Sequence, residues 1–382
     1  MMAEGRDRFE GVLGNETALR LLGRALRTGE VSQAYLFHGP PGVGKRTAAI
    51  KFGAALVAGG NKAAEERAFR GLHPDLTEVL PEGAFTTIGQ VRQVVRLAAS
   101  RPFEGVRRVF VLQADTLNVQ AANALLKTLE EPEGETVFVL LATSREGVLP
   151  TILSRAQAVR FNPVPTNAVA EFLKDRGVEG PELAAGLGRG SVGLSLRYAE
   201  ALEFGELRDA VFRAGFAFSE DFEGRHGAAA EIVGRAEAVG AAREREFLSR
   251  FEEPDRRAKD GAKRAGRGAS DGALRESLEL LALLYRDAAV VEAGAGELVT
   301  NTDRVAKIRD HVDRYPGADW AGAALALGEA RAALGYNISP EATLEVTLSR
   351  IRRKILAPSR GSSTSGSLAG AQPGSVTRGT ST

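Results

Sequence analysis

The sequence predicts an α/β fold over residues 1–163, with a parallel sheet flanked by helices, followed by units that are helical throughout. Three short apolar runs rich in Val, Leu and Phe support this prediction: Ala34–Phe37, Val109–Leu112 and Val137–Leu141. Runs of four or five such residues indicate buried strands, and helical patterns separate them along the chain. Strands that alternate with helices favour a parallel sheet.

Two prolines in the segment Asn162-Pro163-Val164-Pro165 mark the expected end of the sheet, because proline disfavours both helices and strand ladders. Strand patterns fade beyond this point. We therefore expect a small helical unit at 164–203, a larger helical unit at 204–356 and a disordered tail at 357–382. The tail is rich in Ser, Gly and Thr and has too little apolar surface to offset the entropy of ordering.

Composition excludes several classes of function. The 382 residues include 50 basic and 49 acidic side chains and no cysteine, which excludes disulfides, thiolate metal sites and thiol nucleophiles. A net charge of +1 gives no overall attraction to nucleic acid or anionic lipid. The chain lacks the apolar core of a signal peptide and any membrane-length apolar stretch, so we expect a cytoplasmic protein without a membrane partner.

The stretch 252–272 is highly charged, while Ser277–Tyr285 has the amphipathic pattern of a helix. The favoured interpretation of the charged stretch is a solvated loop or a frayed helix end, and the alternative is a nucleic-acid patch. Its basic residues are Arg256, Arg257, Lys259, Lys263, Arg264 and Arg267.

The segment Gly39-Pro40-Pro41-Gly42-Val43-Gly44-Lys45-Arg46-Thr47 lies between a predicted strand and a predicted helix, the context of a phosphate-binding loop. The three glycines Gly39, Gly42 and Gly44 let successive backbone N–H groups point at phosphate oxygens. Lys45 can bridge the β- and γ-phosphates, and the helix N-terminus adds its dipole. The loop therefore predicts binding of ATP or ADP.

Two parts of this loop site depart from what hydrolysis requires. Arg46 stands where a Ser or Thr hydroxyl would hold Mg²⁺, and Thr47 comes one place late, about 100° further round the helix. The strand that should end in acidic residues ends instead with Leu112 and Gln113. The nearest acid, Asp115, is interpreted as a loop residue at the start of the next helix. These departures argue against Mg²⁺ binding and efficient hydrolysis.

The string AANALLKTLEEP, residues 121–132, belongs to a predicted helix that spans Val119–Glu131, with Asn118 as its cap and Pro132 as its stop. The string closely resembles the signature helix of bacterial clamp-loader subunits, which are AAA+ proteins. The resemblance implies an AAA+ P-loop sheet domain at 1–163, a helical lid domain at 164–203 and a helical collar for oligomerisation at 204–356.

Further segments are similar to the same family. Leu141–Ser144 resembles its sensor-1 strand end, which implies that Thr143 faces nucleotide. Leu149–Arg155 resembles its Ser-Arg-Cys motif, with Ala156 in place of the cysteine. Asn337–Pro340, followed by Leu344-Glu345, is similar to its last collar helices.

Within this family the residues favour the delta-prime type over the ATP-hydrolysing gamma/tau motors, because Arg46 and the neutral strand end depart from the motor pattern while Ser154-Arg155 is intact. The resemblance implies that Arg155, with Ser154, is an arginine finger for ATP bound by a neighbouring motor subunit. It also implies a circular hetero-pentamer with gamma/tau and delta subunits, which loads the sliding clamp on primed DNA within the DNA polymerase III holoenzyme. The chain itself is expected to lack polymerase and efficient ATPase activity.

Relatives commonly hold a structural zinc in the segment that corresponds to Gly59–Gly71, which has no cysteine here. The four histidines are too scattered to replace those ligands, so no zinc is expected. A working motor would also carry a sensor-2 arginine at Gly193, although Arg189 and Arg197 are near enough to substitute. The alternatives are an active gamma/tau-type ATPase, a scaffold module whose nucleotide is only structural and, more distantly, a helicase-type ATPase.

Overall fold

The computed structural model describes residues 8–81, 85–131, 134–217, 221–249, 251, 253–333 and 339–356. Within them one five-stranded parallel sheet has the order β2-β3-β4-β1-β5. The predicted strands are confirmed as β1, β3 and β4, the three central ones. Strands β1 to β5 span Ala34–His38, Leu76–Val79, Arg108–Gln113, Thr136–Ala142 and Gln157–Arg160.

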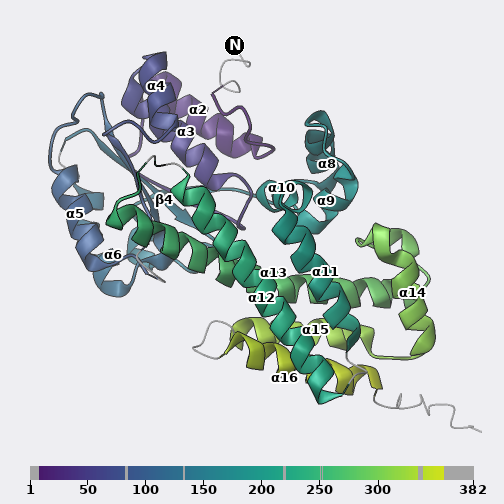
Figure 1. Cartoon of the computed structure of the whole chain (residues 1–382). Coiled ribbons are helices and arrows are strands. Elements are labelled where there is room, and N and C mark those ends of the chain that lie inside the picture. Colours follow the sequence, from purple (N-terminus) through teal and green to yellow (C-terminus); the bar gives the residue numbers. More distant parts are fainter. Residues whose placement is uncertain are drawn as a thin grey trace, which may run out of the picture.

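Helices cover both faces of the sheet (Figure 1). Alternate side chains of each strand point to opposite faces, so Val109 and Val111 pack on one helical layer while Phe110 and Leu112 pack on the other. The first layer contains α2 (Glu16–Thr28), α3 (Lys45–Ala58) and α4 (Lys62–Phe69). The second layer contains α5 (Ile88–Ala98) and α6 (Val119–Glu130). The short elements η1 (Ala114–Thr116) and α7 (Pro150–Leu153) follow β3 and β4.

The helix that carries the family string is confirmed as α6, which ends at Glu130. Asn118 caps it as predicted, because its side-chain oxygen accepts a hydrogen bond from the Ala121 N–H at 2.8 Å. Leu125 and Leu129 are buried against the sheet. Pro132, the predicted stop, lies outside the described residues.

All elements described after β5 are helical. Three short helices pack around Val164, Val169 and Leu173: α8 (Thr166–Asp175), α9 (Pro181–Gly188) and α10 (Val192–Glu200). Six further helices follow: α11 (Leu202–Phe216), α12 (Phe222–Leu248), α13 (Arg256–Glu292), α14 (Val305–Arg314), α15 (Trp320–Ala333) and α16 (Pro340–Leu356). Two short turns, η3 (Gly296–Leu298) and η4 (Thr302–Arg304), join α13 to α14. The exact domain boundaries stay predictions, and the tail at 357–382 lies outside the described residues, as do residues 334–338.

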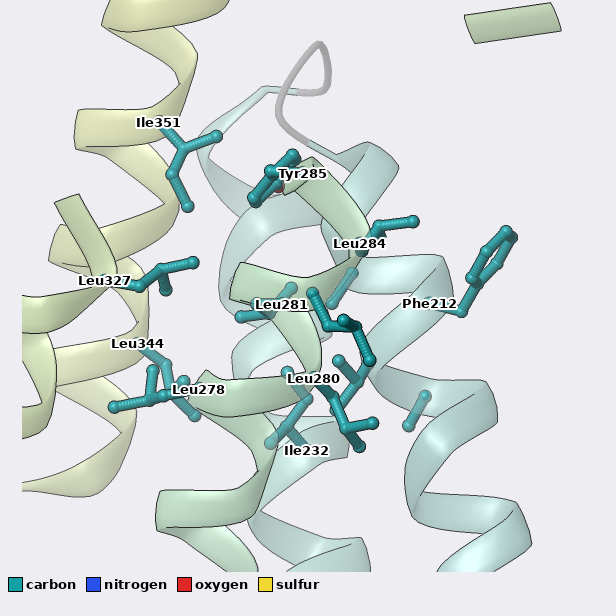
Figure 2. Packing of buried hydrophobic residues seen from close by; sticks show 14 of the residues in the cluster. Phe212, Ile232, Leu278, Leu280, Leu281, Leu284, Tyr285, Leu327, Leu344 and Ile351 are labelled. Carbon is teal, nitrogen blue, oxygen red and sulfur yellow. The ribbon is translucent and has the colours of Figure 1, made fainter. Parts of the chain in front are cut away.

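Helix α13 forms the centre of the larger helical unit, as Figure 2 shows. Leu278, Leu281 and Leu284 of this helix pack against Ile232 of α12 and the other surrounding helices. The hydroxyl of Tyr285 donates a hydrogen bond to the Gly215 carbonyl oxygen at 2.6 Å, so the buried phenol has its polar partner. The predicted helix at Ser277–Tyr285 is confirmed as part of α13.

The charged stretch at 252–272 is not the predicted loop or frayed end, because α13 is helical from Arg256 onward. Asp255 caps this end: its carboxylate accepts a hydrogen bond from the Ala258 N–H at 2.6 Å. Small residues then let α12 and α13 approach closely, and a Cβ added to Gly240 would lie 2.8 Å from the Gly266 carbonyl oxygen. Ala262 is fully buried in this seam. We call residues 240–272 the hairpin arm.

Candidate functional site

The phosphate loop joins the carboxyl end of β1 to α3. Its glycines Gly39, Gly42 and Gly44 have φ angles of 147°, 75° and 95°, which side-chain-bearing residues rarely adopt. The Gly39 N–H donates a hydrogen bond to the Ala142 carbonyl oxygen at 3.2 Å, so the loop is tied to the end of β4, directly before Thr143. The backbone is therefore the glycine-dependent turn that the sequence predicts.

The ammonium of Lys45 folds back onto the loop, where it donates to the carbonyl oxygens of Gly39 and Pro40 at 2.5 Å each. The residue is only 8% exposed. Burial lowers the pKa of Lys45 to about 8, although the negative charge of Asp115 acts in the opposite direction. A buried ammonium held by neutral carbonyls would be better paired with an anion, so the loop fits a phosphate group.

Arg46 reaches away from the loop toward β2. Its Nε and Nη2 atoms donate to the two carboxylate oxygens of Glu78, and this hydrogen-bonded pair raises the pKa of the Arg46 guanidinium despite its partial burial. Thr47 is exposed at the next position of α3. The position thus lacks the hydroxyl that would hold Mg²⁺, and its side chain is held by Glu78 instead. The site therefore fits phosphate better than it fits the metal.

The carboxyl end of β3 is neutral, as the sequence predicts, since the strand ends with Leu112 and Gln113. Asp115 lies in η1, where one carboxylate oxygen accepts hydrogen bonds from the backbone N–H and the hydroxyl of Thr143, at 2.8 Å each. The acid thus fixes the position of Thr143, whose predicted role as a sensor stays a prediction. In the described parts of the chain, no three His, Asp or Glu side chains are grouped so that they could hold a metal ion.

The first residues of α10 close over the phosphate loop. The Gly193 N–H donates to the Gly42 carbonyl oxygen at 3.2 Å, and a Cβ on Gly42 would meet the Ser191 hydroxyl at 1.8 Å. Arg189 is one of the two arginines that the sequence offers as a substitute for a sensor-2 residue. The Arg189 guanidinium donates instead to both carboxylate oxygens of Glu276 in α13, at 2.7 Å each. Arg197 lies over the ring of Phe204. Both arginines are thus engaged away from the loop.

Arg155 and Ser154 lie between α7 and β5, at the amino end of β5. The Nη1 atom of Arg155 donates to the Thr151 carbonyl oxygen at 2.8 Å and to the Ser154 hydroxyl at 3.0 Å, while Nε donates to the Glu130 carboxylate at 2.6 Å. The side chain is 30% exposed and lines a surface hollow of about 650 Å³, together with Gln33 and Gln157. Its guanidinium is therefore anchored yet accessible.

The structure divides the predicted site residues between two edges of the sheet. The carboxyl edge carries seven of them: Gly39, Gly42, Gly44, Lys45, Arg46, Thr47 and Thr143. Arg155 and Ser154 lie at the amino edge. A five-residue strand is about 16 Å long, which exceeds the reach of an arginine side chain, so Arg155 cannot serve the chain's own loop. The pairings of Arg46 with Glu78 and of Arg155 with Glu130 were not predicted. Glu78 belongs to no recognised motif, and Glu130 lies in the family string of α6 but has no local pattern that links it to Arg155.

Comparisons with known proteins agree with these features. A family model described as DNA polymerase III, delta subunit, matches residues 14–165. The DNA polymerase III subunit delta' of Bacillus subtilis is 25% identical over 86% of this chain and 93% of that protein. The delta' subunit of Pseudomonas aeruginosa is 38% identical over 42% of this chain and 53% of its own length. The chain is therefore similar to delta' subunits of DNA polymerase III, over most of its length to the Bacillus subtilis subunit and over its sheet domain to the family model.

The chain also resembles the tau subunit of Bacillus subtilis, with 32% identity over 42% of this chain and 30% of that protein. A gamma subunit-related protein from Thermotoga maritima superposes with a TM-score of 0.41 and 18% identity, over 87% of this chain and 99% of that one. The predicted α/β fold class, a parallel sheet flanked by helices and followed by helical units, is confirmed. Across the described residues no helix combines the length and apolarity needed to cross a membrane.

Proposed function

We propose that this chain is the delta-prime-type subunit of a DNA polymerase III clamp loader, which supplies an arginine finger to ATP bound by a neighbouring motor subunit. The observation that carries the proposal is the contrast between the two edges of the sheet. At the carboxyl edge, Lys45 is folded onto its own loop and Arg46 is paired with Glu78. At the amino edge, Arg155 is anchored and open to a neighbour.

Hydrolysis at the chain's own loop is deficient for two independent reasons. Nucleotide phosphates would be held by Lys45 and by the N–H groups of the glycine loop, but Arg46 occupies the place of the hydroxyl that binds Mg²⁺. The neutral end of β3 offers neither a metal ligand nor an acid to orient the attacking water. A bound nucleotide would therefore act as a ligand of this chain and would not be turned over efficiently.

The hydrogen bonds of the Arg155 guanidinium support its proposed role as an arginine finger. Nη1 is held by the Thr151 carbonyl and the Ser154 hydroxyl, which fixes the direction of the side chain. Nε and Nη2 face Glu130, a carboxylate that is 47% exposed and can be exchanged for a phosphate of the neighbour's ATP. A guanidinium in that place stabilises negative charge on the transferring phosphoryl group, an effect of about 10³ to 10⁵ in rate.

The proposed partners are gamma/tau motor subunits and a delta subunit in a circular hetero-pentamer, with the helical unit at 204–356 as the collar and the cytoplasm as the compartment. Relatives named delta' and gamma/tau support these partners. The assembly would act on the sliding clamp and on primed DNA. The test is reconstitution with motor and delta subunits, read by stoichiometry and by clamp loading on primed DNA. A chain that neither enters the complex nor is needed for loading would contradict the proposal.

The purified chain is expected to hydrolyse ATP no faster than background, and Lys45→Ala is expected to leave that rate unchanged, because the metal site is incomplete. Phosphate release by the chain alone is the measurement. Turnover of about 1 s⁻¹, on the scale of a working site, that is abolished in Lys45→Ala would support the gamma/tau-type alternative. Nucleotide binding without turnover, in a chain that leaves the ATPase of the reconstituted complex unaffected, would support the scaffold alternative.

A further inference from the structure

The hairpin arm reaches beyond the core of the larger helical unit toward the sheet domain (Figure 1). The buried core of that unit ends at Val239 in α12 and begins again at Ala273 in α13, so the arm adds little to it. One side of the arm lines a groove of about 1150 Å³, whose opposite wall includes Leu80 and α5. Small residues of the arm, such as Gly240 and Gly266, pack between α12 and α13. The outer face of α13 in the arm is exposed to solvent.

The outer face of α13 carries a basic stripe: Arg256, Lys259, Lys263 and Arg267. At 100° per residue these four positions fall within about 80° of one another, and they extend over about 16 Å of helix. All four residues are exposed. The groove is lined instead by Gly261, Arg264 and Gly268, which lie on the other side of the helix. The stripe therefore faces away from the rest of the molecule.

Within the described part of the chain, the four stripe residues have no carboxylate partner, whereas the nearby Arg243 and Arg245 of α12 are paired with Glu246 and Glu203. Asp260 and Asp271 lie beside the stripe, about 20° and 40° from Arg267 on the same scale, so this exposed face carries four positive and two negative side chains. Like charges four residues apart on a helix repel one another by a few tenths of a kcal/mol. Lys259, Lys263 and Arg267 repel one another in this way, Asp260 and Asp271 offset part of that repulsion, and an anionic ligand would relieve the rest.

We infer that this basic stripe binds the phosphate backbone of double-stranded DNA. Basic residues at four-residue spacing lie about 6 Å apart along α13, and duplex DNA carries one negative charge per roughly 1.7 Å of its axis. A stripe of 16 Å can therefore lie beside several phosphates at once. Its lysine and arginine side chains reach outward from a rigid helix, and such backbone contacts position a protein without reading sequence.

The inference rests on the proposed function, which places this chain beside primed DNA. A net charge of +1 gives the whole chain no general affinity for DNA, so a local stripe is needed to make the contact. The binding is expected to be independent of sequence and strongly dependent on salt, because each phosphate contact releases counterions.

The test is binding of the full chain to a fluorescein-labelled 30-base-pair duplex, followed by fluorescence anisotropy between 50 and 200 mM salt. The triple variant Lys259→Ala/Lys263→Ala/Arg267→Ala removes three charges and keeps good helix formers in α13. Its affinity is expected to fall at least about tenfold at 100 mM salt. The slope of log K against log salt is expected to flatten by about 0.9 for each lost contact.

The matched control is Lys307→Ala/Arg309→Ala/Arg314→Ala, which removes three exposed charges from α14, at the other end of the helical unit (Figure 1). This control is expected to bind the duplex as the unmodified chain does. No duplex binding by the unmodified chain, as expected if the stripe meets an acidic protein instead, would overturn the inference. Equal losses in the two triple variants would also overturn it. Duplex binding uses the chain alone, so its failure is distinct from a failure in the reconstituted complex.

Discussion

Replacing Arg155 by alanine is expected to slow ATP turnover about 10³-fold or more at the one motor site that this residue faces, while the complex still assembles. The side chain is 30% exposed, and its partners Glu130, Thr151 and Ser154 all belong to its own chain. Its removal therefore leaves no cavity in the core of the sheet domain. Arg155→Lys is expected to retain most of the defect, because an ammonium cannot donate from two sides as the guanidinium does.

The measurement is single-turnover phosphate release from the reconstituted complex. With Arg155→Ala, the amplitude of the fast phase is expected to fall by the part that one motor site contributes. The matched control is Arg101→Ala, which removes an exposed arginine from the loop that leads into β3. That control is expected to preserve the full fast phase. A fast phase of unchanged size in Arg155→Ala, with assembly intact, would remove Arg155 from the role of arginine finger.

Apolar patterns in the sequence predict the three central strands of the sheet but not its two edge strands, and the reason is physical. β1, β3 and β4 are covered on both faces, so they read as continuous apolar runs. The edge strands β2 and β5 have the sequences LTEV and QAVR. Most of their residues are partly exposed in β2 and exposed in β5, so by pattern alone these strands resemble loop segments.

The sequence motifs indicate the phosphate loop and Arg155, but they do not indicate the ion pairs that hold the arginine side chains of the two regions. The pair of Arg46 with Glu78 and the pair of Arg155 with Glu130 join residues 32 and 25 positions apart, so no local pattern predicts them. The closure of α10 over Gly42 depends on two glycines that meet only in the folded chain. The prediction of a loop or frayed helix end at 252–272 was wrong. The hairpin arm is stabilised by close packing of Gly and Ala residues between α12 and α13, and the many charged residues of this stretch give no sign of that packing.

A second large effect, on stability, is expected at Asp75, whose carboxylate is completely buried just before β2. It accepts hydrogen bonds from the Nε and Nη2 atoms of Arg108, at 3.2 and 3.0 Å, and from three backbone N–H groups of residues 103–105. Asp75→Ala would leave the buried Arg108 guanidinium without its counter-charge. The free energy of unfolding of the sheet domain is expected to fall by about 3–5 kcal/mol.

The single tryptophan, Trp320, allows this loss to be placed in the chain, because it is buried in the larger helical unit. Urea unfolding followed by far-UV circular dichroism reports both units, whereas Trp320 fluorescence reports the helical one. Asp75→Ala is expected to move the dichroism transition to lower urea. The control Glu231→Ala breaks an exposed ion pair with Arg213 and is expected to change the unfolding free energy by at most about 1 kcal/mol. A similar small change in Asp75→Ala would contradict the assigned role of Asp75.

The pH dependence of this difference tests the same electrostatic cause. Burial by itself raises the pKa of the Asp75 carboxyl, but the backbone hydrogen bonds and Arg108 outweigh burial and hold the pKa below its ordinary value. The ionised Asp75 therefore contributes stability above the unfolded-state pKa of about 3.9, and that contribution is lost as pH falls through the lower folded-state value. The gap in unfolding free energy between the unmodified chain and Asp75→Ala should be constant at neutral pH and narrow below about pH 4. A gap that stays constant into acid would mean that the charge of Asp75 does not stabilise the fold.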